Sequence, residues 1–576
     1  MNAPTDAITV DITALSHDGR GIARLAAADG QGRGAVVFVT NALPGQKVLA
    51  RITRRKSSFI EAEALQLLRE APDAARPICP HHADCGGCPL QTMPYEQQLY
   101  WKRTITLDAL SRIGGLNRST LETLLGPVAP SPAAIRFRNK MEFAFGPDAS
   151  RECGLILGLR RRNGRDVVAV PECALMPAEA LRMVDMVGNL AAKSGLAAYV
   201  PPDVRPGARP GTRPNSRSVA MTASRRKANQ CKQAARGNRH EPARRVPNHY
   251  YTEQQDTADP GFWRFFVLRR GLAADLRTPR WWALCITSPG DAQQRAAVRA
   301  LGREVLAAFP QLYAFIHEER AAADAFAFGE KRVQTLDATG MDNPAAARLF
   351  QPLNGAYFAL DAASFFQVNT AAAQVLARTA QSMLTPQAEA APESRGLLDL
   401  YCGVGAPGLL LAADYATLLG LEQDARAVKL AKINAASSGQ HHCRYEAGDA
   451  ALRLERLAAC GAQNMWAATH SQTTQGDNEA ADAPADAAKP NTHAGTTLPS
   501  VTDALVDPPR AGLSPRALDA LLRIAPERIL YISCNPSTLA RDAAQLRCRY
   551  RLERLAVVDL FPHTPHLETL SLWLKA

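Results

Sequence analysis

The chain has 576 residues, 46% of them hydrophobic and 21% charged, which is the composition of a globular protein and predicts more than one domain. No apolar run approaches the roughly 20 residues of a membrane span, and the N-terminus lacks the basic and apolar regions of a signal peptide, so we expect a cytoplasmic protein. The net charge of +12 is concentrated in residues 201–250, which hold 12 Lys and Arg against 2 Asp and Glu, so it indicates a polyanionic partner only weakly.

Short apolar runs separated by glycines fill residues 7–68. Their spacing predicts a small β-barrel of about 65 residues. One hairpin of this barrel carries four basic residues: Arg51, Arg54, Arg55 and Lys56. Such a hairpin suits a phosphate backbone, although an ordinary solvated edge strand has the same pattern.

Three closely spaced cysteines follow the predicted barrel. Cys79, Cys85 and Cys88 form the pattern C-x5-C-x2-C, with glycines that allow the loop to fold tightly. Thiolate-rich loops hold zinc or an iron–sulfur cluster, and either needs a fourth ligand. Cys173 and Cys153 are nearby candidates, and the spacing does not decide the metal.

The centre of the chain begins with helical spacing over residues 95–125 and turns β-rich near residue 136. There Phe137, Phe143 and Phe145 interleave with basic residues. This pattern fits either contact with nucleic acid or the buried side of an amphipathic strand.

Proline and arginine dominate residues 201–258, which predicts a disordered basic insertion. Strands over 261–269 and 281–287 and a helix around 291–308 then predict an α/β central region.

From about residue 355, strands and helices alternate to the end of the chain. The alternation predicts an α/β fold with a doubly wound sheet, in which a helix spans roughly 369–384. Residues 463–500, rich in Ala, Thr, Asn, Asp and Pro, interrupt the pattern and predict a second disordered insertion.

A glycine turn marks a cofactor site in this region. Residues 397–409 are typical of a strand, a turn with Gly403, Gly405 and Gly408, and a helix. Glu422 ends the next strand, where a carboxylate accepts ribose hydroxyls, and Asp449 follows one strand later. The set predicts an adenosyl cofactor without separating NAD from S-adenosylmethionine.

The apolar run 529–532 ends at Ser533-Cys534-Asn535-Pro536, and a helical pattern follows. Cys534 therefore lies at the carboxyl end of a predicted strand, before a helix N-terminus that favours the thiolate. The alternative is a small buried cysteine that only ends a strand. Methylation at carbon 5 of a pyrimidine requires a thiolate at carbon 6 and a base for the carbon 5 proton, whereas hydride transfer by a nicotinamide enzyme requires neither.

Together these motifs resemble the S-adenosylmethionine-dependent RNA uracil-5 methyltransferases, and most closely their iron–sulfur members that act on 23S ribosomal RNA. The resemblance covers residues 7–195 and 260–576. The motifs that carry it are Ser533-Cys534-Asn535-Pro536, Asp507-Pro508-Pro509-Arg510, Ser364-Phe365-Phe366-Gln367 and Phe561-Pro562-His563-Thr564-Pro565-His566-Leu567-Glu568.

The resemblance implies three domains. They are an RNA-binding TRAM domain with an OB-like barrel over 1–70, a central domain with the cysteine loop over 71–355, and a Rossmann-like methyltransferase domain over 356–576. It also implies Cys534 as the nucleophile and Glu568 as the base. The implied ligands of a [4Fe-4S] cluster are Cys79, Cys85, Cys88 and Cys173. The implied S-adenosylmethionine contacts are Gln367, Tyr401, Ala406, Glu422, Asp449 and Asp507, and Ala406 stands where a polar residue is usual.

The implied function is methylation of a uridine in 23S ribosomal RNA to 5-methyluridine by a monomeric enzyme. The same chemistry on transfer RNA is the nearest alternative, and the cysteine cluster favours ribosomal RNA. A non-catalytic RNA-binding iron–sulfur protein is a third reading, but binding alone requires neither Cys534 nor Glu568.

Overall fold

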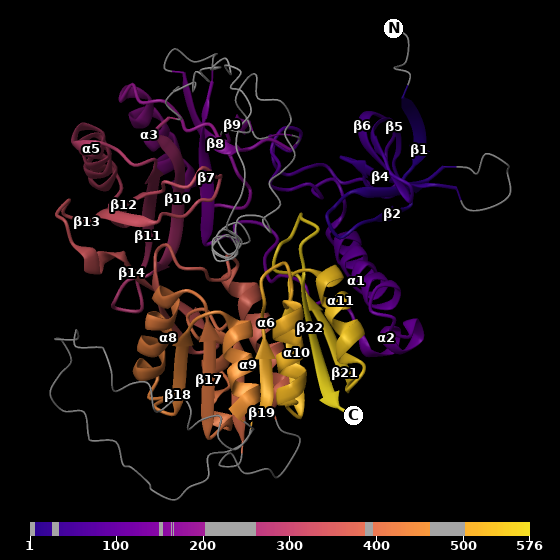
Figure 1. Cartoon of the computed structure of the whole chain (residues 1–576). Coiled ribbons are helices and arrows are strands. Elements are labelled where there is room, and N and C mark those ends of the chain that lie inside the picture. Colours follow the sequence, from indigo (N-terminus) through magenta and orange to yellow (C-terminus); the bar gives the residue numbers. More distant parts are fainter. Residues whose placement is uncertain are drawn as a thin grey trace, which may run out of the picture.

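The computed structural model describes residues 6–25, 34–148, 154–162, 164, 166–201, 261–385, 395–460 and 501–576. Three β-sheets organise these residues (Figure 1). The predicted insertion 463–500 and Cys153 lie outside the described residues, as does the predicted insertion 201–258 apart from Pro201. Within the described ranges, no helix has the length and apolar character needed to cross a bilayer.

The N-terminal sheet has six strands in the order β1-β5-β6-β4-β3-β2. All neighbouring strands are antiparallel except β4 and β6, which run parallel. Alternate side chains such as Val37 and Val39 point into one small core, as the two-residue period of a strand requires. The strands are β1 (Ala7–Asp11), β2 (Ala14–Leu15), β3 (Gly21–Arg24), β4 (Val36–Thr40), β5 (Lys47–Arg55) and β6 (Phe59–Arg69).

Two helices, α1 (Tyr95–Arg112) and α2 (Arg118–Leu124), follow the cysteine loop, as the helical spacing predicts. Buried side chains of α1, including Leu107 and Leu110, share a hydrophobic core with Leu539 of the C-terminal sheet region. This early segment is therefore packed into the same body as the end of the chain.

The central sheet has nine strands, seven of them in the order β13-β12-β11-β10-β7-β8-β9, and β14 joins β15 to β10. Phe137, Phe143 and Phe145 are buried, so they belong to the core and do not face nucleic acid. The elements are β7 (Lys140–Pro147), β8 (Leu155–Arg160), β9 (Val167–Val168), α3 (Ala178–Lys193), β10 (Trp263–Leu272), β11 (Pro279–Thr287), α5 (Ala292–Ala308), β12 (Leu312–Glu319), β13 (Lys331–Asp337), the short 3-10 helix η2 (Pro344–Ala347), β14 (Arg348–Leu353) and β15 (Ala356–Asp361).

The C-terminal sheet has seven strands in the order β18-β17-β16-β19-β20-β22-β21. Strands β16 to β20 are parallel and β22 is antiparallel to both neighbours, so the predicted doubly wound α/β class is correct. The strands are β16 (Gly396–Leu400), β17 (Thr417–Glu422), β18 (Cys443–Ala447), β19 (Val501–Val506), β20 (Arg528–Ser533), β21 (Tyr550–Val558) and β22 (Glu568–Lys575). The helices are α6 (Thr370–Leu384), α7 (Ala406–Leu409), η4 (Ala412–Asp414), α8 (Ala425–Ser437), α9 (Ala450–Cys460), α10 (Pro515–Ile524) and α11 (Pro536–Leu546).

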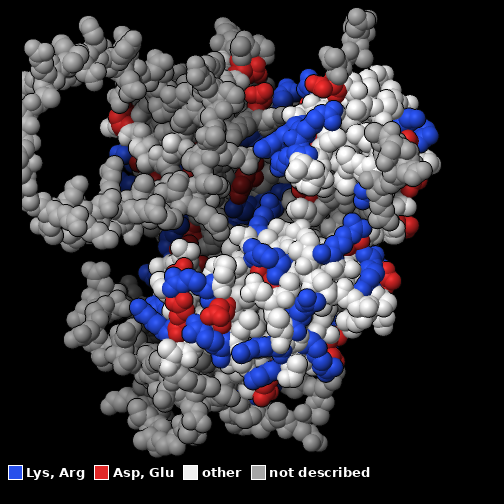
Figure 2. Space-filling view, turned by 45° about the vertical axis from the view of Figure 1, so that its right-hand side comes forward, with Lys and Arg blue, Asp and Glu red and all other residues white. Residues whose placement is uncertain are grey.

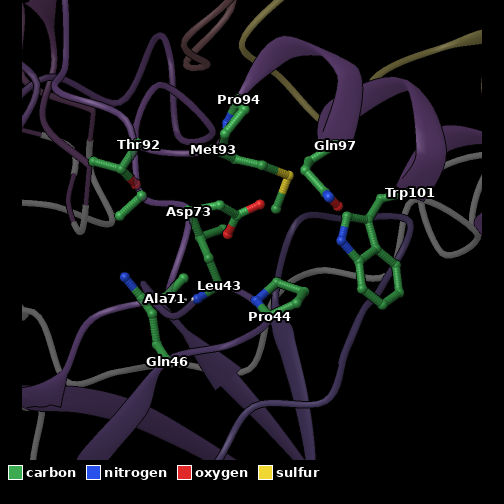
Figure 3. Close-up of a pocket in the computed structure, with 11 residues that line it drawn as sticks. Leu43, Pro44, Gln46, Ala71, Asp73, Thr92, Met93, Pro94, Gln97 and Trp101 are labelled. Carbon is green, nitrogen blue, oxygen red and sulfur yellow. Dashed lines mark hydrogen bonds between the residues drawn. The ribbon is translucent and has the colours of Figure 1, made fainter.

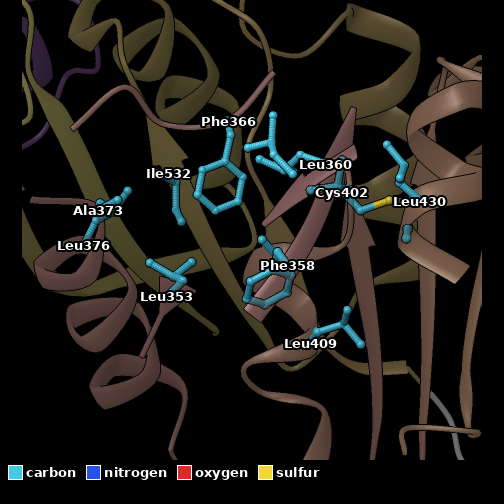
Figure 4. Close-up of a cluster of buried hydrophobic side chains, with 14 of the residues drawn as sticks. Leu353, Phe358, Leu360, Phe366, Ala373, Leu376, Cys402, Leu409, Leu430 and Ile532 are labelled. Atoms are coloured by element: carbon cyan, nitrogen blue, oxygen red, sulfur yellow. The ribbon is translucent and has the colours of Figure 1, made fainter. Parts of the chain in front are cut away.

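The strand order reverses between β16 and β19, and ligands of open α/β sheets bind at such a point, beyond the carboxyl ends of the strands. The hairpin β14–β15 closes this region from the central side. Phe358 of β15 and Phe366 pack in one hydrophobic cluster with Ile532 of β20 (Figure 4). The cluster thus fixes the segment around Gln367 against the strand that leads to Cys534.

Candidate active site

The glycine turn after β16 forms the floor of the site. Tyr401 has a φ of 63° and Gly405 has a φ of 84°, so the chain turns sharply into α7. A Cβ atom on Gly405 would lie 2.9 Å from the Tyr445 hydroxyl, and one on Gly408 would lie 2.3 Å from Asp399 Oδ2. Glycine is therefore required here for close packing of the turn on the sheet. Ala406 is buried, so its side chain packs into the core.

Glu422, at the end of β17, holds this turn from the neighbouring strand. Its carboxylate accepts a hydrogen bond from the Gly403 amide at 3.1 Å and one from the Asp424 amide at 2.9 Å. Asp449 follows β18, is exposed, and accepts from the Leu452 amide at 2.9 Å. Burial, and next the charge of Asp449, raise the pKa of the Tyr401 phenol to about 12. Tyr401, Glu422 and Asp449 are therefore gathered beyond the ends of three adjacent strands.

Acidic groups converge beneath the turn. Burial, then the charge of Asp507, raises the pKa of Asp399 to about 8, and the charge of Glu422 contributes further. Burial alone raises the pKa of Asp507, directly after β19, to about 7. Buried carboxyl groups with raised pKa values are stabilised as anions by a nearby cation. The site therefore suits a positively charged ligand.

Cys534 lies at the carboxyl end of β20, immediately before α11, as predicted. Its neighbour Asn535 caps α11 by accepting from the Ser537 amide at 3.0 Å. Burial opposes the preference for the thiolate that is predicted at this helix N-terminus. Burial, and then the charge of Glu568, raises the pKa of the Cys534 thiol to about 11, while Arg510 lowers it.

Glu568 is the first residue of β22 and is 4% exposed. Because β22 runs antiparallel to β20, its first residue lies at the same sheet edge as the last residues of β20. Burial, and then the charge of Asp507, raises the pKa of Glu568 well above its ordinary value, and Arg510 lowers it. Cys534, Glu568 and Asp507 therefore share one small volume.

Arg510 is the cationic partner of both groups. Its carbonyl accepts from Asn535 Nδ2 at 3.2 Å and from Thr538 Oγ1 at 3.2 Å, which fixes the Asp507–Arg510 turn to the start of α11. Its guanidinium lies 3.5 Å from His566 Nε2. Arg510 thus favours the ionised forms of the thiol and the carboxyl. The sequence marked Arg510 only as part of the Asp507-Pro508-Pro509-Arg510 motif and did not indicate this role.

Gln367 lies on the segment between β15 and α6. Its carbonyl accepts from Asn139 Nδ2 at 3.0 Å, so the central sheet region holds this segment. Phe365 is 77% exposed. An exposed ring beside the site offers a face on which an unpaired base stacks.

The four predicted metal ligands line one cavity. Its volume is about 500 Å³, and its wall includes Cys79, Cys85, Cys88 and Cys173. Among the described residues, no three His, Cys, Asp or Glu side chains are arranged to share a single metal ion. A [4Fe-4S] cluster differs, because each cysteine binds a different iron and the sulfurs stand around a larger body.

The rest of the cavity wall fits such a body. Gln91, Arg138 and Arg162 also line it, and among the described residues the buried Arg138 Nε and Arg162 Nε have no hydrogen-bond partner. Burial lowers the pKa of both guanidinium groups, while the cysteines Cys85 and Cys88 raise that of Arg162. Buried donors without acceptors are costly, and an anionic cluster with sulfur acceptors would satisfy them.

A second cavity lies between the N-terminal sheet and α1, with a volume of about 30 Å³. Leu43, Pro44 and Asp73 face Met93 and Trp101 across it (Figure 3). None of the predicted site residues lines it, so we assign it no function.

Positive charge gathers beside the site. Figure 2 shows Lys and Arg side chains around the hollow in the middle of the visible face. On the N-terminal sheet, Arg51 pairs with Glu63 at 3.1 Å and Lys56 with Glu61 at 3.7 Å. Arg54 and Arg55 are exposed, and within the described ranges neither forms an ion pair. These two residues remain available for phosphates.

The fold is that of a Rossmann-like methyltransferase with an N-terminal TRAM domain. Residues 497–576 match the family described as tRNA (Uracil-5-)-methyltransferase, and residues 6–65 match the TRAM domain. The chain is 32% identical over 574 residues to an uncharacterized RNA methyltransferase of Nitratidesulfovibrio vulgaris, covering 99% of this chain and 97% of that protein. The chain therefore belongs to the RNA methyltransferases, and its C-terminal part is a tRNA (Uracil-5-)-methyltransferase family domain.

Two further comparisons agree. An uncharacterized RNA methyltransferase of Geobacter sulfurreducens is 27% identical over 576 residues, covering 99% of this chain and 90% of that protein. The crystal structure of Pyrococcus abyssi tRNA (uracil-54, C5)-methyltransferase in complex with S-adenosyl-L-homocysteine has the same fold. It superposes with a TM-score of 0.59 at 20% identity and covers 98% of this chain and all of that one.

Proposed function

We propose that this protein methylates carbon 5 of a uridine in 23S ribosomal RNA through a covalent cysteine–uracil intermediate. The observation that carries the proposal is the placement of Cys534 and Glu568 at one sheet edge, beside the cationic Arg510 and the acidic cofactor floor. A nucleophile and a base at one point are what carbon 5 methylation requires and what RNA binding alone does not.

The chain's residues then act in order. The target base must leave its stack, and exposed Phe365 offers a stacking face for it. Cys534 Sγ gives its proton to solvent and, as the thiolate that Arg510 favours, forms a bond to carbon 6 while the carbon 5–carbon 6 double bond opens. Bound S-adenosylmethionine supplies the methyl group to carbon 5. Glu568, in the ionised form that Arg510 favours, accepts the carbon 5 proton, and the Cys534–carbon 6 bond breaks to regenerate the thiolate.

For the cofactor, we propose contacts with the predicted residues. Glu422 accepts from the ribose, Asp449 meets the adenine, and Asp507 with Asp399 favours the positive sulfonium. The proposed cofactor contacts also include Gln367 and Tyr401, and Ala406 through its backbone. We propose domain boundaries at residues 70 and 355. The second boundary falls between β14 and β15, which pair with each other.

We further propose that Cys79, Cys85, Cys88 and Cys173 hold a [4Fe-4S] cluster. The shared cavity and its unpartnered donors support this proposal. The cluster in turn supports ribosomal RNA as the substrate. Transfer RNA is the second candidate, because the family that matches residues 497–576 is named for it.

The deciding experiment is methyl incorporation from labelled S-adenosylmethionine into unmodified 23S and transfer RNA transcripts, followed by nucleoside analysis. We expect 5-methyluridine in the 23S transcript alone. Label in transfer RNA alone would show that transfer RNA is the substrate and would leave the proposed chemistry unchanged. Label in a nucleoside other than 5-methyluridine would overturn the proposed reaction. As a control, Cys534→Ala should give no label in either RNA.

A further inference from the structure

The segment of residues 136–140, which we call the connecting segment, lies between the cysteine cavity and the backbone around Gln367. On one side it borders the cysteine cavity, where Arg138 and Lys140 form part of the wall. Its backbone is tied to the chain that follows Cys173, since the amide of Arg136 donates to Ala174 at 2.7 Å and that of Arg138 to Leu175 at 3.2 Å. The connecting segment is therefore bonded to the chain directly after Cys173 and forms part of the wall of the cysteine cavity.

On its other side, the connecting segment holds the backbone around Gln367. Asn139 is 7% exposed and its Nδ2 donates to the Gln367 carbonyl at 3.0 Å and to Thr370 Oγ1 at 2.8 Å. The Asn139 amide donates to the Val368 carbonyl at 2.8 Å, and Arg138 forms an antiparallel bridge with Asn369. Val368 itself lines the cysteine cavity.

The segment around Gln367 has a second anchor. Arg269 of β10 is fully buried, and its guanidinium donates to the carbonyls of Ala362, at 3.3 Å, and Ser364. Burial lowers the pKa of Arg269 to about 10, so it stays a cation at neutral pH. The stretch from Ala362 to Thr370 is thus held from the central sheet by Asn139 and Arg269 together. Side-chain amides and guanidinium groups that bind a backbone fix its path, and a misplaced path weakens ligand binding.

We propose that the connecting segment makes S-adenosylmethionine binding depend on the content of the cysteine cavity, and that Asn139 is the positioning residue that transmits this dependence. The inference rests on the proposed cluster and on Gln367 as a cofactor contact. A filled cavity fixes the chain at Cys88, Cys173 and Arg138. The connecting segment then holds Gln367 and Val368 in the binding conformation, and an empty cavity releases it.

The test measures binding of S-adenosylhomocysteine by calorimetry, so that no turnover is needed. Three preparations of the wild-type chain are compared: as purified without oxygen, after iron removal with a chelator, and after reconstitution with iron and sulfide. Iron and acid-labile sulfide contents measure how far the cysteine cavity is filled in each preparation. We expect iron removal to raise the Kd about tenfold, the equivalent of about 1.4 kcal/mol, and reconstitution to restore it. An unchanged Kd in iron-free protein that remains folded would overturn the proposed dependence.

The role of Asn139 is tested separately. Asn139→Ala, and Asn139→Asp with the same shape but without the donor amide, should both raise the Kd about tenfold while iron content stays at the wild-type level. Asn117→Ala is the matched control, since Asn117 caps α2 and touches neither site. Hydrogen exchange of the amides from 361 to 370 should accelerate in both Asn139 variants and in iron-free protein.

These outcomes separate the two proposals. Absence of iron and sulfide from anaerobically purified protein would refute the cluster. In that case the Asn139 variants still test the positioning role, because the hydrogen bonds to Gln367 and Thr370 exist without it. Wild-type affinity and exchange in both Asn139 variants would overturn Asn139 as the positioning residue.

Discussion

Cys534 and Glu568 lie opposite each other at the edge of the C-terminal sheet. Ser533 of β20 pairs with Thr569 of β22, and the next step of this antiparallel register sets Cys534 against Glu568. The charge of Glu568 raises the pKa of the Cys534 thiol. The fold therefore brings together a thiol and a carboxyl that are 34 positions apart in sequence.

Replacing Cys534 with Ala should abolish methyl transfer, by at least about 10⁴-fold, because removal of a catalytic nucleophile typically has that effect. Binding of S-adenosylhomocysteine should stay within about twofold of wild type, since Cys534 is proposed to touch the base and not the cofactor. Labelled methyl incorporation measures methyl transfer, and calorimetry measures S-adenosylhomocysteine binding. Cys548→Ala, which removes an exposed cysteine, is the control and should leave both unchanged. Retained turnover in Cys534→Ala would refute the covalent mechanism.

Glu568→Gln keeps the size of the side chain and removes the base. We expect turnover to fall by about 10²- to 10⁴-fold, the usual contribution of general base catalysis. Because the methylated adduct then loses its carbon 5 proton slowly, a covalent protein–RNA species should accumulate. Denaturing gel electrophoresis with labelled RNA detects it. Slow turnover without any adduct would assign the proton transfer to another group.

S-adenosylmethionine affinity should depend on pH more steeply than S-adenosylhomocysteine affinity. The raised pKa values, about 8 for Asp399 and about 7 for Asp507, mean that both carboxyl groups gain protons as the pH falls through this range. Protonation removes negative charge that attracts the sulfonium, so S-adenosylmethionine should bind more weakly at about pH 6 than at about pH 9.

S-adenosylhomocysteine lacks the sulfonium charge and serves as the matched ligand in this titration. Calorimetry of both ligands across the same pH range measures the difference. Parallel pH profiles for the two ligands would show that Asp399 and Asp507 do not face the sulfur. Asp507→Asn should flatten the S-adenosylmethionine profile.

Lys102 of α1 and Asp559 form a buried ion pair with 2.6 Å between Nζ and Oδ1, and Asp559 also accepts from the Tyr95 hydroxyl at 2.9 Å. Lys102→Met leaves Asp559 buried without its cation and should lower the free energy of unfolding by about 3–5 kcal/mol. Denaturant unfolding measures the loss. Arg118→Met removes exposed pairs with Asp108 and Glu122 and should cost less than about 1 kcal/mol. Equal losses in both variants would contradict a special role for the buried pair.

Arg54 and Arg55 of the TRAM domain are expected to contact phosphates. The double variant Arg54→Ala/Arg55→Ala should weaken RNA binding to a similar extent for different sequences. It should also reduce the slope of log affinity against log salt by up to about 2, because each lost phosphate contact releases one counterion fewer. Filter binding at several salt concentrations measures this. An unchanged slope would place the RNA elsewhere.

The sequence alone identified the class of the C-terminal sheet and the residues at its carboxyl edge. It could do so because strand ends, glycine turns and helix starts are local signals. Tyr401, Asp507 and Cys534 each follow a strand directly, and Glu422 is the last residue of one. The order of the strands then brings these residues together without further information. The proposal of Cys534 as nucleophile and Glu568 as base likewise comes from the sequence, since the chemistry depends on residue type.

Only the tertiary structure decided the ionisation state of Cys534 and the connections of the cysteine loop. The helix start favours the thiolate, but burial and Glu568 raise the pKa of the thiol to about 11, and burial depends on how distant segments pack. No local signal marked Asn139, which reaches across 228 residues to Gln367, or Lys102, which reaches across 457 residues to Asp559. Desolvation and long-range hydrogen bonds are properties of the packed chain, and a local pattern of residues does not contain them.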